Sequence, residues 1–475
     1  MYDFDLVVIG SGPAGEKGAA QAAYFGKRVA VVEMEMHLGG ACINTGTLPS
    51  KTLRETALYL SGMQQRTLYG VSCEVRRDVS VPDLMCRQEP VIGSQNDRIH
   101  ENLQRHKIEL IHGKASFLDE HTIEVVPQSG LSRRITTDAT LIATGTSPFR
   151  PPYVPFEDPG VDDSDTILKL PSVPKRLVIL GGGVIGCEYG SMFAALGCDV
   201  TLVEGRESIL GFLDAEMNHL LAEQMRALGM DIILKRQVVD VSRKDGVLQC
   251  TLDDGRVLPC ERLLFAGGRA GNSLGLGLDR IGVTADSRGL LKVDEHYRLE
   301  GARGGRIYAA GDVIGFPALA SIAMEQGRVA ACHAFDIGYK TSVTHMFPYG
   351  LYTIPEVSMV GETEETAAKK GLTFEVGRAR YHDNARGQIV GDTSGLVKLL
   401  FTVPDKKIIG VHVLGERATE LVHTGMAVMH FGGTLDDFIS MVFNFPTLGE
   451  LFKYAAYDGL DRLARRAAFT APAVA

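Results

Sequence analysis

The stretch Gly10-Ser-Gly12-Pro-Ala-Gly15 follows an apolar run, Asp5 to Ile9, that is typical of a buried parallel strand. The segment from Pro13 to Phe25 predicts a helix, and a second apolar strand then ends at Glu33. Glycines at this spacing admit a pyrophosphate to the helix N-terminus, where the helix dipole and free N–H groups favour an anion. A carboxylate at Glu33 would accept hydrogen bonds from a ribose diol. The stretch therefore predicts a dinucleotide-binding unit.

The same unit recurs further along the chain. Gly181-Gly-Gly183-Val-Ile-Gly186 again follows an apolar strand, and the next strand ends at Glu204. The two glycine turns and the two acids share one offset, 171 residues, so a whole β-α-β unit is repeated. A lone Gly-x-Gly-x-x-Gly is weak evidence, because unrelated turns match it, but strand, turn, helix and acid recur here in register. The chain is therefore expected to contain two Rossmann-like domains.

The first unit leads into a loop that reads Gly39-Gly-Ala-Cys42-Ile-Asn-Thr-Gly-Thr47-Leu-Pro-Ser-Lys51. Its glycine pair lets the backbone come close to a bound group. Pro49 can open a helix, since its missing N–H needs no intrahelical acceptor there, which would place Lys51 in the first turn. The position where a redox partner for the Cys42 thiol would stand holds Thr47, which forms neither a disulfide nor a thiolate.

Three later segments complete the nucleotide units. Thr140-Leu-Ile-Ala-Thr144-Gly145, which precedes a proline-rich segment, and Phe265-Ala-Gly-Gly268-Arg269 are expected at crossings between domains. Arg306-Ile-Tyr-Ala-Ala-Gly311-Asp312 predicts a strand that delivers an aspartate at its C-terminal end, where ligands of open α/β sheets bind. A helix is expected from Ala318 to Ala331, and the small apolar tail, 467–475, is expected to be disordered.

Taken together, these motifs resemble the pyridine nucleotide-disulfide oxidoreductases over nearly the whole chain. That family carries Gly-Gly-x-Cys-x-x-x-Gly-Cys-x-Pro-Ser-Lys, with a disulfide stacked against FAD. The resemblance implies an α/β fold with two Rossmann-like domains, for FAD and for NAD(P), and a C-terminal α+β domain for homodimerisation. The implied division is FAD-binding domain over 1–150 and 271–344, NAD(P)-binding domain over 151–270, and interface domain over 345–475.

The resemblance also assigns residues to each bound group. For FAD it implies a site built from Gly10, Gly12, Gly15, Glu33, Gly40, Cys42, Lys51, Ala115, Thr144, Gly145, Gly311, Asp312, Ala318 and Ala320. For NAD(H) or NADP(H) it implies a site built from Gly181, Gly183, Ile185, Gly186, Glu188, Glu204, Arg206 and Gly268. The residues placed at the chemistry are Lys51, Glu188, Cys42 and Thr47.

Lys51 and Glu188 are expected to form an ion pair near flavin N5, as the matching residues do in the family. A fixed cation there stabilises the negative charge that an arriving hydride brings. The alternative for Lys51 is a solvated surface lysine, and for Glu188 an acid that complements the helix dipole. Cys42 is expected to be a bystander packed against the flavin.

The segment Phe443-Asn-Phe445-Pro-Thr-Leu-Gly-Glu450 bears on the reaction. In the disulfide reductases it reads His-x-His-Pro-Thr-x-x-Glu, and the second histidine is the acid–base catalyst for thiol–disulfide exchange. Here that position is Phe445, which cannot move a proton, while Glu450 remains. Together with Thr47, this change predicts that the enzyme does not reduce disulfides. The sequence resembles instead the soluble pyridine nucleotide transhydrogenase branch of the family.

The implied activity is ping-pong hydride transfer between NADPH and NAD through FAD. Glu204 favours a ribose 2′-OH and repels a 2′-phosphate by about 4 kcal/mol at 4 Å and an effective dielectric near 20. Arg206 offsets part of that repulsion, and NAD(H) is expected to bind better than NADP(H). The alternatives are an NADH-dependent diaphorase or oxidase that reduces oxygen, a quinone or a dye, and a non-catalytic flavoprotein that senses nicotinamides.

Composition and charge limit the kinds of partner that the protein can have and the compartment in which it is expected. A net charge of −9 argues against nucleic acid or an anionic membrane as the main partner. No apolar run is long enough to span a bilayer, and the N-terminus lacks the basic region of a signal peptide. The eight cysteines contain no Cys-x-x-Cys pair, so neither a metal site nor a disulfide framework is expected. A reducing, cytoplasmic setting fits this cysteine usage.

Overall fold

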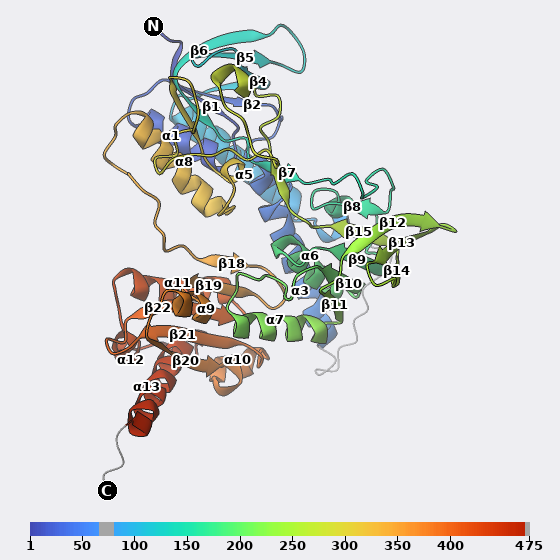
Figure 1. The fold of residues 1–475 in the computed structure, drawn as a ribbon, viewed down its shortest axis with the longest axis vertical. Coiled ribbons are helices and arrows are strands. Elements are labelled where there is room, and N and C mark those ends of the chain that lie inside the picture. Colours follow the sequence, from blue (N-terminus) through green and yellow to red (C-terminus); the bar gives the residue numbers. More distant parts are fainter. Residues whose placement is uncertain (66–79, 471–475) are drawn as a thin grey trace.

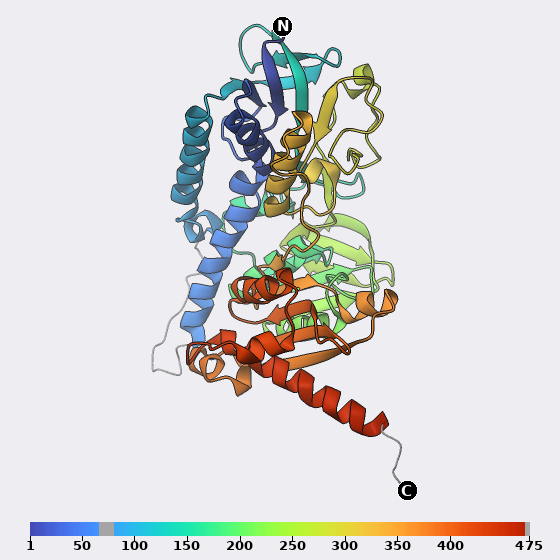
Figure 2. The same cartoon turned by 90° about the vertical axis from the view of Figure 1, so that its left-hand side faces the viewer.

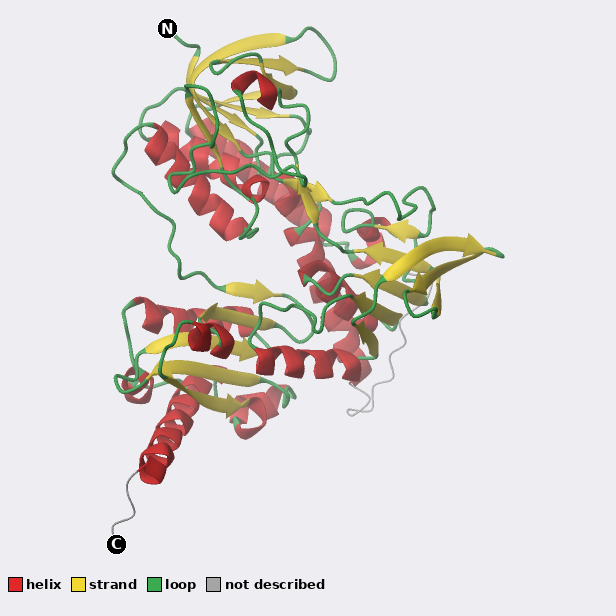
Figure 3. Cartoon of the chain, in the orientation of Figure 1, coloured by secondary structure: helices red, strands yellow, loops and turns green. Residues whose placement is uncertain are grey.

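The structure is a computed structural model that describes residues 1–65 and 80–470. Figure 1 shows an elongated molecule with a mixed unit of sheet and helices at each end and a third unit to one side between them. Figure 3 shows that helices flank the sheets of all three units, in keeping with the predicted α/β class. Cys73 and the end of the tail, 471–475, lie outside the described residues, so the expected disorder of the tail stays a prediction there.

The first unit is built on a sheet with the strand order β3-β2-β1-β6-β5-β4, and β17 also pairs with β6. The strands β1, β2, β3, β6 and β17 run parallel, whereas β4 and β5 are added antiparallel. Their bounds are β1 Phe4–Ile9, β2 Val29–Glu33, β3 Glu109–His112, β4 Lys114–Phe117, β5 Thr122–Val126, β6 Arg133–Ile142 and β17 Arg306–Ala309. Strands far apart in the chain thus share one sheet, as the crossing motifs predict.

Two helices that are distant in sequence cover one face of this sheet. The helices α1 (Pro13–Tyr24) and α8 (Ala320–Ala334) pack closely because glycines meet at their contact. A Cβ on Gly18 would lie 2.9 Å from the Gly327 carbonyl oxygen, and a Cβ on Gly327 would overlap the Ala14 carbonyl oxygen. The small residues of α1 therefore form its packing face.

The second unit repeats the parallel arrangement in the order β11-β10-β9-β15-β8, with α6 (Val184–Ala195) after β9 and α7 (Ala215–Ala227) after β10. A three-stranded antiparallel sheet, β12-β13-β14, extends it. The bounds are β8 Val161–Asp162, β9 Arg176–Leu180, β10 Asp199–Glu204, β11 Met230–Leu234, β12 Val238–Lys244, β13 Val247–Leu252, β14 Val257–Cys260 and β15 Arg262–Phe265. The two crossings between units, β7 (Thr146–Pro148) and β16 (Arg269–Gly271), pair antiparallel with each other.

The C-terminal unit is an antiparallel sheet in the order β18-β19-β22-β21-β20, flanked by helices. Its strands are β18 Tyr349–Leu351, β19 Val357–Gly361, β20 Phe374–Arg380, β21 Leu396–Thr402 and β22 Ile408–Leu414. Its helices are α9 Glu364–Lys369, α10 Ala385–Val390, α11 Ala418–His430, α12 Leu435–Ser440 and α13 Leu451–Thr470. Figure 2 shows α13 projecting from this unit.

The remaining helices lie in the first half of the chain: α2 Gly40–Asn44, α3 Thr47–Gln65, α4 Val81–Leu84 and α5 Gln88–Arg105. Figure 2 shows the long helix α3 running from the first unit toward the C-terminal unit. The expected start of α3 at Pro49 is wrong. The Ser50 N–H donates to the Gly46 carbonyl, so the helix opens at Thr47 and Lys51 falls in its second turn.

The expected helix from Ala318 also starts later than predicted. The Ala323 N–H donates to the Leu319 carbonyl, so Leu319 is the cap and α8 begins at Ala320. Ala318 therefore lies exposed in the loop before the helix. Periodicity places an element, but the first hydrogen bond decides where it begins.

Candidate active site

The first glycine turn is built so that two of its glycines serve the fold and one faces open space. Gly10 has φ +102°, and a Cβ there would overlap the Ala143 carbonyl oxygen; a Cβ on Gly15 would overlap the Gly10 carbonyl oxygen. A Cβ on Gly12 would have its closest neighbour, Gly40 Cα, 4.0 Å away. The turn thus leaves a cradle at Gly12, against the N-terminus of α1, where an anion is favoured.

The second turn repeats this geometry. Gly181 has φ +113°, a Cβ on Gly186 would overlap the Gly181 carbonyl oxygen, and a Cβ on Gly183 would meet nothing within 4 Å. Because both turns keep their middle glycine open, each unit presents the N-terminus of a helix to a phosphate-sized group. The internal repeat seen in the sequence is therefore a repeat of site geometry.

The two acids at the strand ends also bind the same backbone groups. Glu33 accepts hydrogen bonds from Ser11 N at 2.8 Å and from Glu35 N at 3.0 Å. Glu204 accepts from Gly182 N at 2.7 Å and from Arg206 N at 2.9 Å. Each carboxylate thus ties the glycine turn to the loop two residues beyond itself, a role that sequence reasoning missed.

One difference separates the two acids. The guanidinium of Arg206 donates to both oxygens of Glu204, at 3.0 and 2.9 Å, whereas the equivalent residue of the first unit is Glu35. Burial alone would raise the pKa of Glu204, but the hydrogen bonds from Arg206 and the backbone outweigh it and hold that pKa below its usual range. The expected proximity of Arg206 to Glu204 is therefore present as a two-point ion pair.

Lys51 and Glu188 meet where the first two units face each other. Lys51 Nζ, from α3, lies 2.7 Å from Glu188 Oε2, from α6. The Glu188 side chain is 6% exposed and that of Lys51 24% exposed, so the pair is largely shielded from water. The other oxygen of Glu188 accepts the Tyr352 N–H at 2.9 Å, and Lys51 Nζ lies 4.8 Å from the centre of the Tyr352 ring. The expected ion pair forms, and Tyr352 is a partner that sequence reasoning missed.

Cys42 is held in α2, next to the threonine that takes the place of the family's second cysteine. Burial raises the pKa of the Cys42 thiol, and a hydrogen bond with Thr47 lowers it only in part. The described cysteines are all unpaired. A half-buried thiol with a raised pKa is a poor nucleophile, which fits a bystander better than a redox group.

The other residues expected at FAD gather around the first glycine turn. A Cβ on Gly40 would approach Gly12 Cα to 3.1 Å, and a Cβ on Gly311 would approach Ala14 Cβ to 3.1 Å. Thr144 Oγ1 is buried without a hydrogen-bond partner, and Gly145 faces open space. An unpartnered buried hydroxyl beside an open glycine is what a polar cofactor would satisfy.

Asp312 lies at the C-terminal end of the segment that follows β17. Burial raises its pKa, and Arg269 and Thr146 lower it in part. Thr146 Oγ1 lies 3.4 Å from Asp312 Oδ2 and accepts a hydrogen bond from Arg269 Nε at 2.8 Å. Asp312 is therefore joined through the paired crossings β7 and β16 to the second unit.

Some expected contact residues sit less directly at the turns. Ala115 is buried in a core cluster and pairs with Val125 of β5, so its side chain packs in the core. Ile185 is half-buried near the start of α6, and Gly268 has φ +121° with Arg288 beside it. Ala320 is the first residue of α8. The structure therefore gives clearer support for the glycines of the two turns, the two acids and Lys51 as site residues than for these four residues.

Phe445 lies in an exposed apolar segment of the C-terminal unit. The Phe445 side chain is 75% exposed and Val442 94% exposed, and Tyr454 Oη donates to Glu450 Oε1 at 3.4 Å. A phenylalanine and a valine left this open are typical of a surface that another chain covers.

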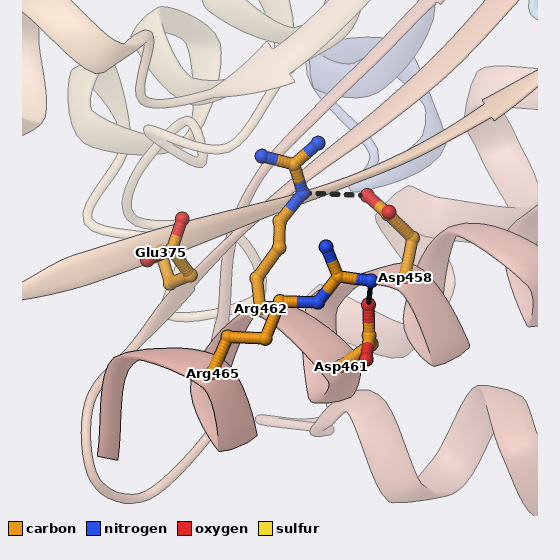
Figure 4. A pocket seen from close by; sticks show the side chains of 5 residues that line it. All are labelled: Glu375, Asp458, Asp461, Arg462 and Arg465. Atoms are coloured by element: carbon orange, nitrogen blue, oxygen red, sulfur yellow. Dashed lines mark hydrogen bonds and ion pairs between the residues drawn. The ribbon is translucent and has the colours of Figure 1, made fainter. Parts of the chain in front are cut away.

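Two hollows lie away from the glycine turns. One, of about 330 Å³, lies between β20 and α13, and Figure 4 shows two ion pairs among the charged side chains that line it, Arg462 with Asp458 and Arg465 with Asp461. The other, of about 470 Å³, has Asn44 and Thr45 of the Cys42 loop in its lining. Neither contains the Lys51–Glu188 pair.

One group of three carboxylates in the described part of the chain is close enough to hold a cation: Asp214, Glu216 and Glu364. Lys398 Nζ already lies among them, 2.7 Å from Asp214 Oδ1 and 2.9 Å from Glu216 Oε2. Arg378 Nη2 also lies 2.8 Å from Glu216 Oε2 and 3.4 Å from Glu364 Oε1. The lysine and the arginine together supply the positive charge that this cluster needs.

Comparison with known sequences assigns the chain to a family. Residues 4–327 match the model of the family described as pyridine nucleotide-disulphide oxidoreductase, and residues 347–456 match the dimerisation domain of that family. The chain belongs to the pyridine nucleotide-disulphide oxidoreductase family. It is therefore a flavin-dependent oxidoreductase that acts on pyridine nucleotides, with FAD as its cofactor. The predicted fold class is confirmed, and the dimerisation domain supports the expected homodimer.

Relatives within this oxidoreductase family share nearly the whole length. The soluble pyridine nucleotide transhydrogenase of Mycobacterium tuberculosis (strain ATCC 25177 / H37Ra) is 46% identical over 465 residues, which cover 98% of each chain. The protein of the same name from Ectopseudomonas mendocina is 41% identical over 469 residues, 98% of this chain and 99% of that one. The predicted resemblance to this branch is confirmed.

Solved structures of the oxidoreductase family share the fold. LpdA from Mycobacterium tuberculosis superposes with a TM-score of 0.87 at 26% identity, covering 95% of this chain and 99% of its own. The HOCl-induced flavoprotein disulfide reductase RclA from Escherichia coli gives 0.83 at 28% identity, covering 94% and 99%. Among the described residues, no helix combines the length and apolar character needed to cross a bilayer.

Proposed function

We propose that this enzyme transfers hydride between NADPH and NAD by a ping-pong sequence, in which the two nicotinamides occupy one site in turn. The observation that carries the proposal is the shielded Lys51–Glu188 pair between two open glycine turns, with Thr47 where a second cysteine would stand. Relatives at 46% and 41% identity are named for this activity. When bound, FAD supplies the hydride acceptor and donor through which the two nicotinamides exchange.

In this proposal, the residues around the first turn hold FAD. The pyrophosphate would lie against Gly12, where space is open, and Glu33 would meet the adenosine ribose. The FAD set is completed by Gly10, Gly15, Gly40, Cys42, Lys51, Ala115, Thr144, Gly145, Gly311, Asp312, Ala318 and Ala320. Lys51, held by Glu188, would place a fixed positive charge beside the hydride-accepting nitrogen, where it stabilises developing negative charge.

The second turn would hold either nicotinamide nucleotide. Gly183 gives the pyrophosphate room, and Glu204 with Arg206 would read the adenosine ribose. The NAD(P) set is completed by Gly181, Ile185, Gly186, Glu188 and Gly268. Because hydride must pass at one place, a single pocket that accepts both nucleotides is what a ping-pong transhydrogenase requires.

In this proposal no disulfide relays electrons. Cys42 has a raised pKa and only a threonine as its partner, and Phe445 has no titratable group. Hydride would therefore leave the flavin for a second nicotinamide at the same site by which it entered.

Anaerobic mixing tests the proposal. Purified yellow enzyme is mixed with NADPH and then with thio-NAD, while the flavin and thio-NADH absorbances are followed. The expected result is bleaching by NADPH and full recovery of colour with stoichiometric thio-NADH. Bleaching by NADPH without recovery on thio-NAD would contradict it.

A second candidate is an NADH-preferring diaphorase or oxidase, because Glu204 disfavours a 2′-phosphate. In that case colour would return only with air, a quinone or a dye. A protein that does not bleach with either nucleotide would fit the third candidate, a nicotinamide sensor, which has no need of a cation at the flavin. We further propose the domain division at 150, 270 and 344 and a cytoplasmic location.

A further inference from the structure

The short connection between β18 and β19 joins the C-terminal unit to the ion pair at the proposed flavin site. Its main chain contacts both helices that carry the pair. The Tyr352 N–H donates to Glu188 Oε1 at 2.9 Å, and the Ile354 N–H donates to Ser191 Oγ at 3.0 Å, both on α6. The Thr353 carbonyl accepts from Arg54 Nε on α3 at 3.2 Å.

The same connection is anchored by a buried arginine. The Arg54 side chain is 5% exposed, and its Nη2 lies 3.0 Å from Glu356 Oε1. The other oxygen of Glu356 accepts from Thr419 N at 3.0 Å and from Thr419 Oγ1 at 2.8 Å, on α11. The position of Tyr352 is therefore fixed by α3, α6 and α11 together.

The Tyr352 ring lies beneath the cation of the pair. Lys51 Nζ is 4.8 Å from the ring centre, within the range of a cation–π contact, and Arg54 Cζ is 6.0 Å from it. Besides its bond to Glu188, Lys51 Nζ donates a longer hydrogen bond to Ser50 Oγ at 3.3 Å. Both partners are acceptors at the tip of the side chain, and a flexible four-carbon stem keeps rotational freedom behind such a tip. The Tyr352 ring supplies a third contact on the Lys51 ammonium, from its apolar side, while the Tyr352 N–H fixes the other oxygen of Glu188.

We propose that Tyr352 is a positioning residue for Lys51, so that an aromatic ring from the C-terminal unit sets the electrostatic environment of the bound FAD. The inference rests on the proposed function in one respect, that Lys51 lies beside the hydride-accepting nitrogen. It also gives the C-terminal unit a part in the chemistry besides dimerisation.

The test separates the face of the ring from its bulk. Tyr352→Leu keeps the main-chain N–H and most of the apolar volume but removes the π face. Tyr352→Phe keeps the face and loses only the hydroxyl. Phenylalanine fluorinated around the ring, placed at 352, keeps the shape while weakening the attraction for a cation. Phe335→Leu is the matched control, because Lys27 Nζ lies 4.7 Å from the Phe335 ring in a pair remote from the glycine turns.

The readout is the two-electron midpoint potential of bound FAD, measured without nicotinamide by anaerobic equilibration with a reference dye. We expect Tyr352→Leu and the fluorinated ring to disfavour reduction about tenfold, a potential lower by about 30 mV. Tyr352→Phe and Phe335→Leu should leave the potential at the wild-type value. Reduction by NADH in stopped flow should slow in the Leu variant with unchanged nucleotide affinity.

An unchanged potential in Tyr352→Leu would overturn the inference, as would a shift in the Leu variant that the fluorinated ring does not share. If Tyr352→Leu fails to retain FAD, the fluorinated and Phe variants decide the matter alone. The potential is measured without nicotinamide, so it is independent of the transhydrogenase assay. If that assay fails while Tyr352→Leu still shifts the potential, the proposed function is contradicted and the role of Tyr352 is supported.

Discussion

Glu33 and Glu204 each accept one backbone hydrogen bond from their glycine turn and one from the residue two places further on, but of the two only Glu204 forms an ion pair with an arginine. The residue two places beyond Glu33 is Glu35, and the residue two places beyond Glu204 is Arg206. The first unit thus surrounds its ribose position with negative charge, whereas the second balances its acid with a cation. If the second unit holds the nicotinamide nucleotide as proposed, Arg206 would offset part of the repulsion between Glu204 and a 2′-phosphate.

Replacing Arg206 should therefore affect the binding of NADPH and of NADH differently. Arg206→Glu copies the first unit and should raise the KM for NADPH at least about tenfold, because a hydrogen bond to a charged group is lost. The KM for NADH should change little. Steady-state kinetics with each donor, using one acceptor dye, measures the ratio.

The converse change is Glu204→Ala. Removing the carboxylate should shift the preference toward NADPH, since repulsion of the 2′-phosphate disappears. If the NADPH/NADH ratio stayed at the wild-type value in both variants, the nucleotides would be read elsewhere.

Lys51→Met should slow flavin reduction by NADH about 10²-fold, because the cation proposed to stabilise developing charge is lost. Lys17→Met is the matched control, since Lys17 pairs with Glu16 at 2.8 Å with similar exposure, 28% and 8%. Stopped-flow absorbance at the flavin band measures both. Equal slowing in the two variants would show that Lys51 acts through stability alone.

Much of the site was predictable because its signals are local. The glycine turns, Glu33, Glu204 and the Cys42 loop each follow from a few consecutive residues whose geometry is fixed by φ and by helix dipoles. The Lys51–Glu188 pair joins residues 137 positions apart, and only the family resemblance pointed to it.

The missed features depend on contacts between units. Nothing local in Tyr352-Thr-Ile-Pro-Glu356 indicates that its main chain reaches α6, 164 residues earlier. Lys398 lies in the strand β21, and nothing in the sequence of that strand indicates that its lysine is fully buried among acids from the start of α7 and from α9. The late start of α8 is a local feature: Leu319 has an extended backbone and makes no side-chain cap hydrogen bond, and periodicity does not indicate this.

Thr47→Cys should restore a cysteine pair without restoring disulfide reduction. Thr47 is close enough to hydrogen-bond the Cys42 thiol, so a cysteine there should form a disulfide when diamide removes the two thiol hydrogens and the electron pair. The free-thiol count should fall by two relative to untreated variant, and Cys42→Ser in the same background should prevent this.

The variant should still fail to reduce a disulfide substrate with NADH, because Phe445 provides no acid–base group. If the single variant Thr47→Cys did reduce a disulfide substrate, the role assigned to Phe445 would be refuted. Cys42→Ser by itself should leave hydride exchange near the wild-type rate, as befits a bystander.

Lys398→Met should destabilise the protein by about 3–5 kcal/mol, because the buried lysine is the shared partner of three carboxylates. The Lys398 and Asp214 side chains are each 1% exposed, so water cannot replace the lost charge. Burial alone would raise the pKa of Asp214, but the nearby imidazole of His412 and the hydrogen bond from Lys398 outweigh it. Burial alone would lower the pKa of Lys398, but its hydrogen bonds with Asp214 and Glu364 outweigh it. The pKa of Asp214 therefore lies below its usual range and that of Lys398 above.

The pH dependence follows from those directions. A carboxylate with a depressed folded pKa contributes stability above its unfolded pKa, about 4, and that contribution is lost as the pH falls through the folded value. A lysine with a raised folded pKa contributes below its unfolded pKa, about 10.5, and loses this as the pH rises through the folded value. The difference between wild type and Lys398→Met should thus be largest near neutral pH and shrink in acid, where the carboxylates that have lost Lys398 as a partner take up protons.

Urea unfolding of the FAD-bound enzyme, followed by far-UV circular dichroism from pH 3.5 to pH 8, measures that difference. Lys406→Met is the matched control, because Lys406 pairs with Asp436 at the surface with exposures of 30% and 58% and should cost about 0–1 kcal/mol at every pH. A Lys398→Met deficit that stayed constant down to pH 3.5 would mean that lost packing, and not the loss of the lysine charge beside the carboxylates, destabilises the variant.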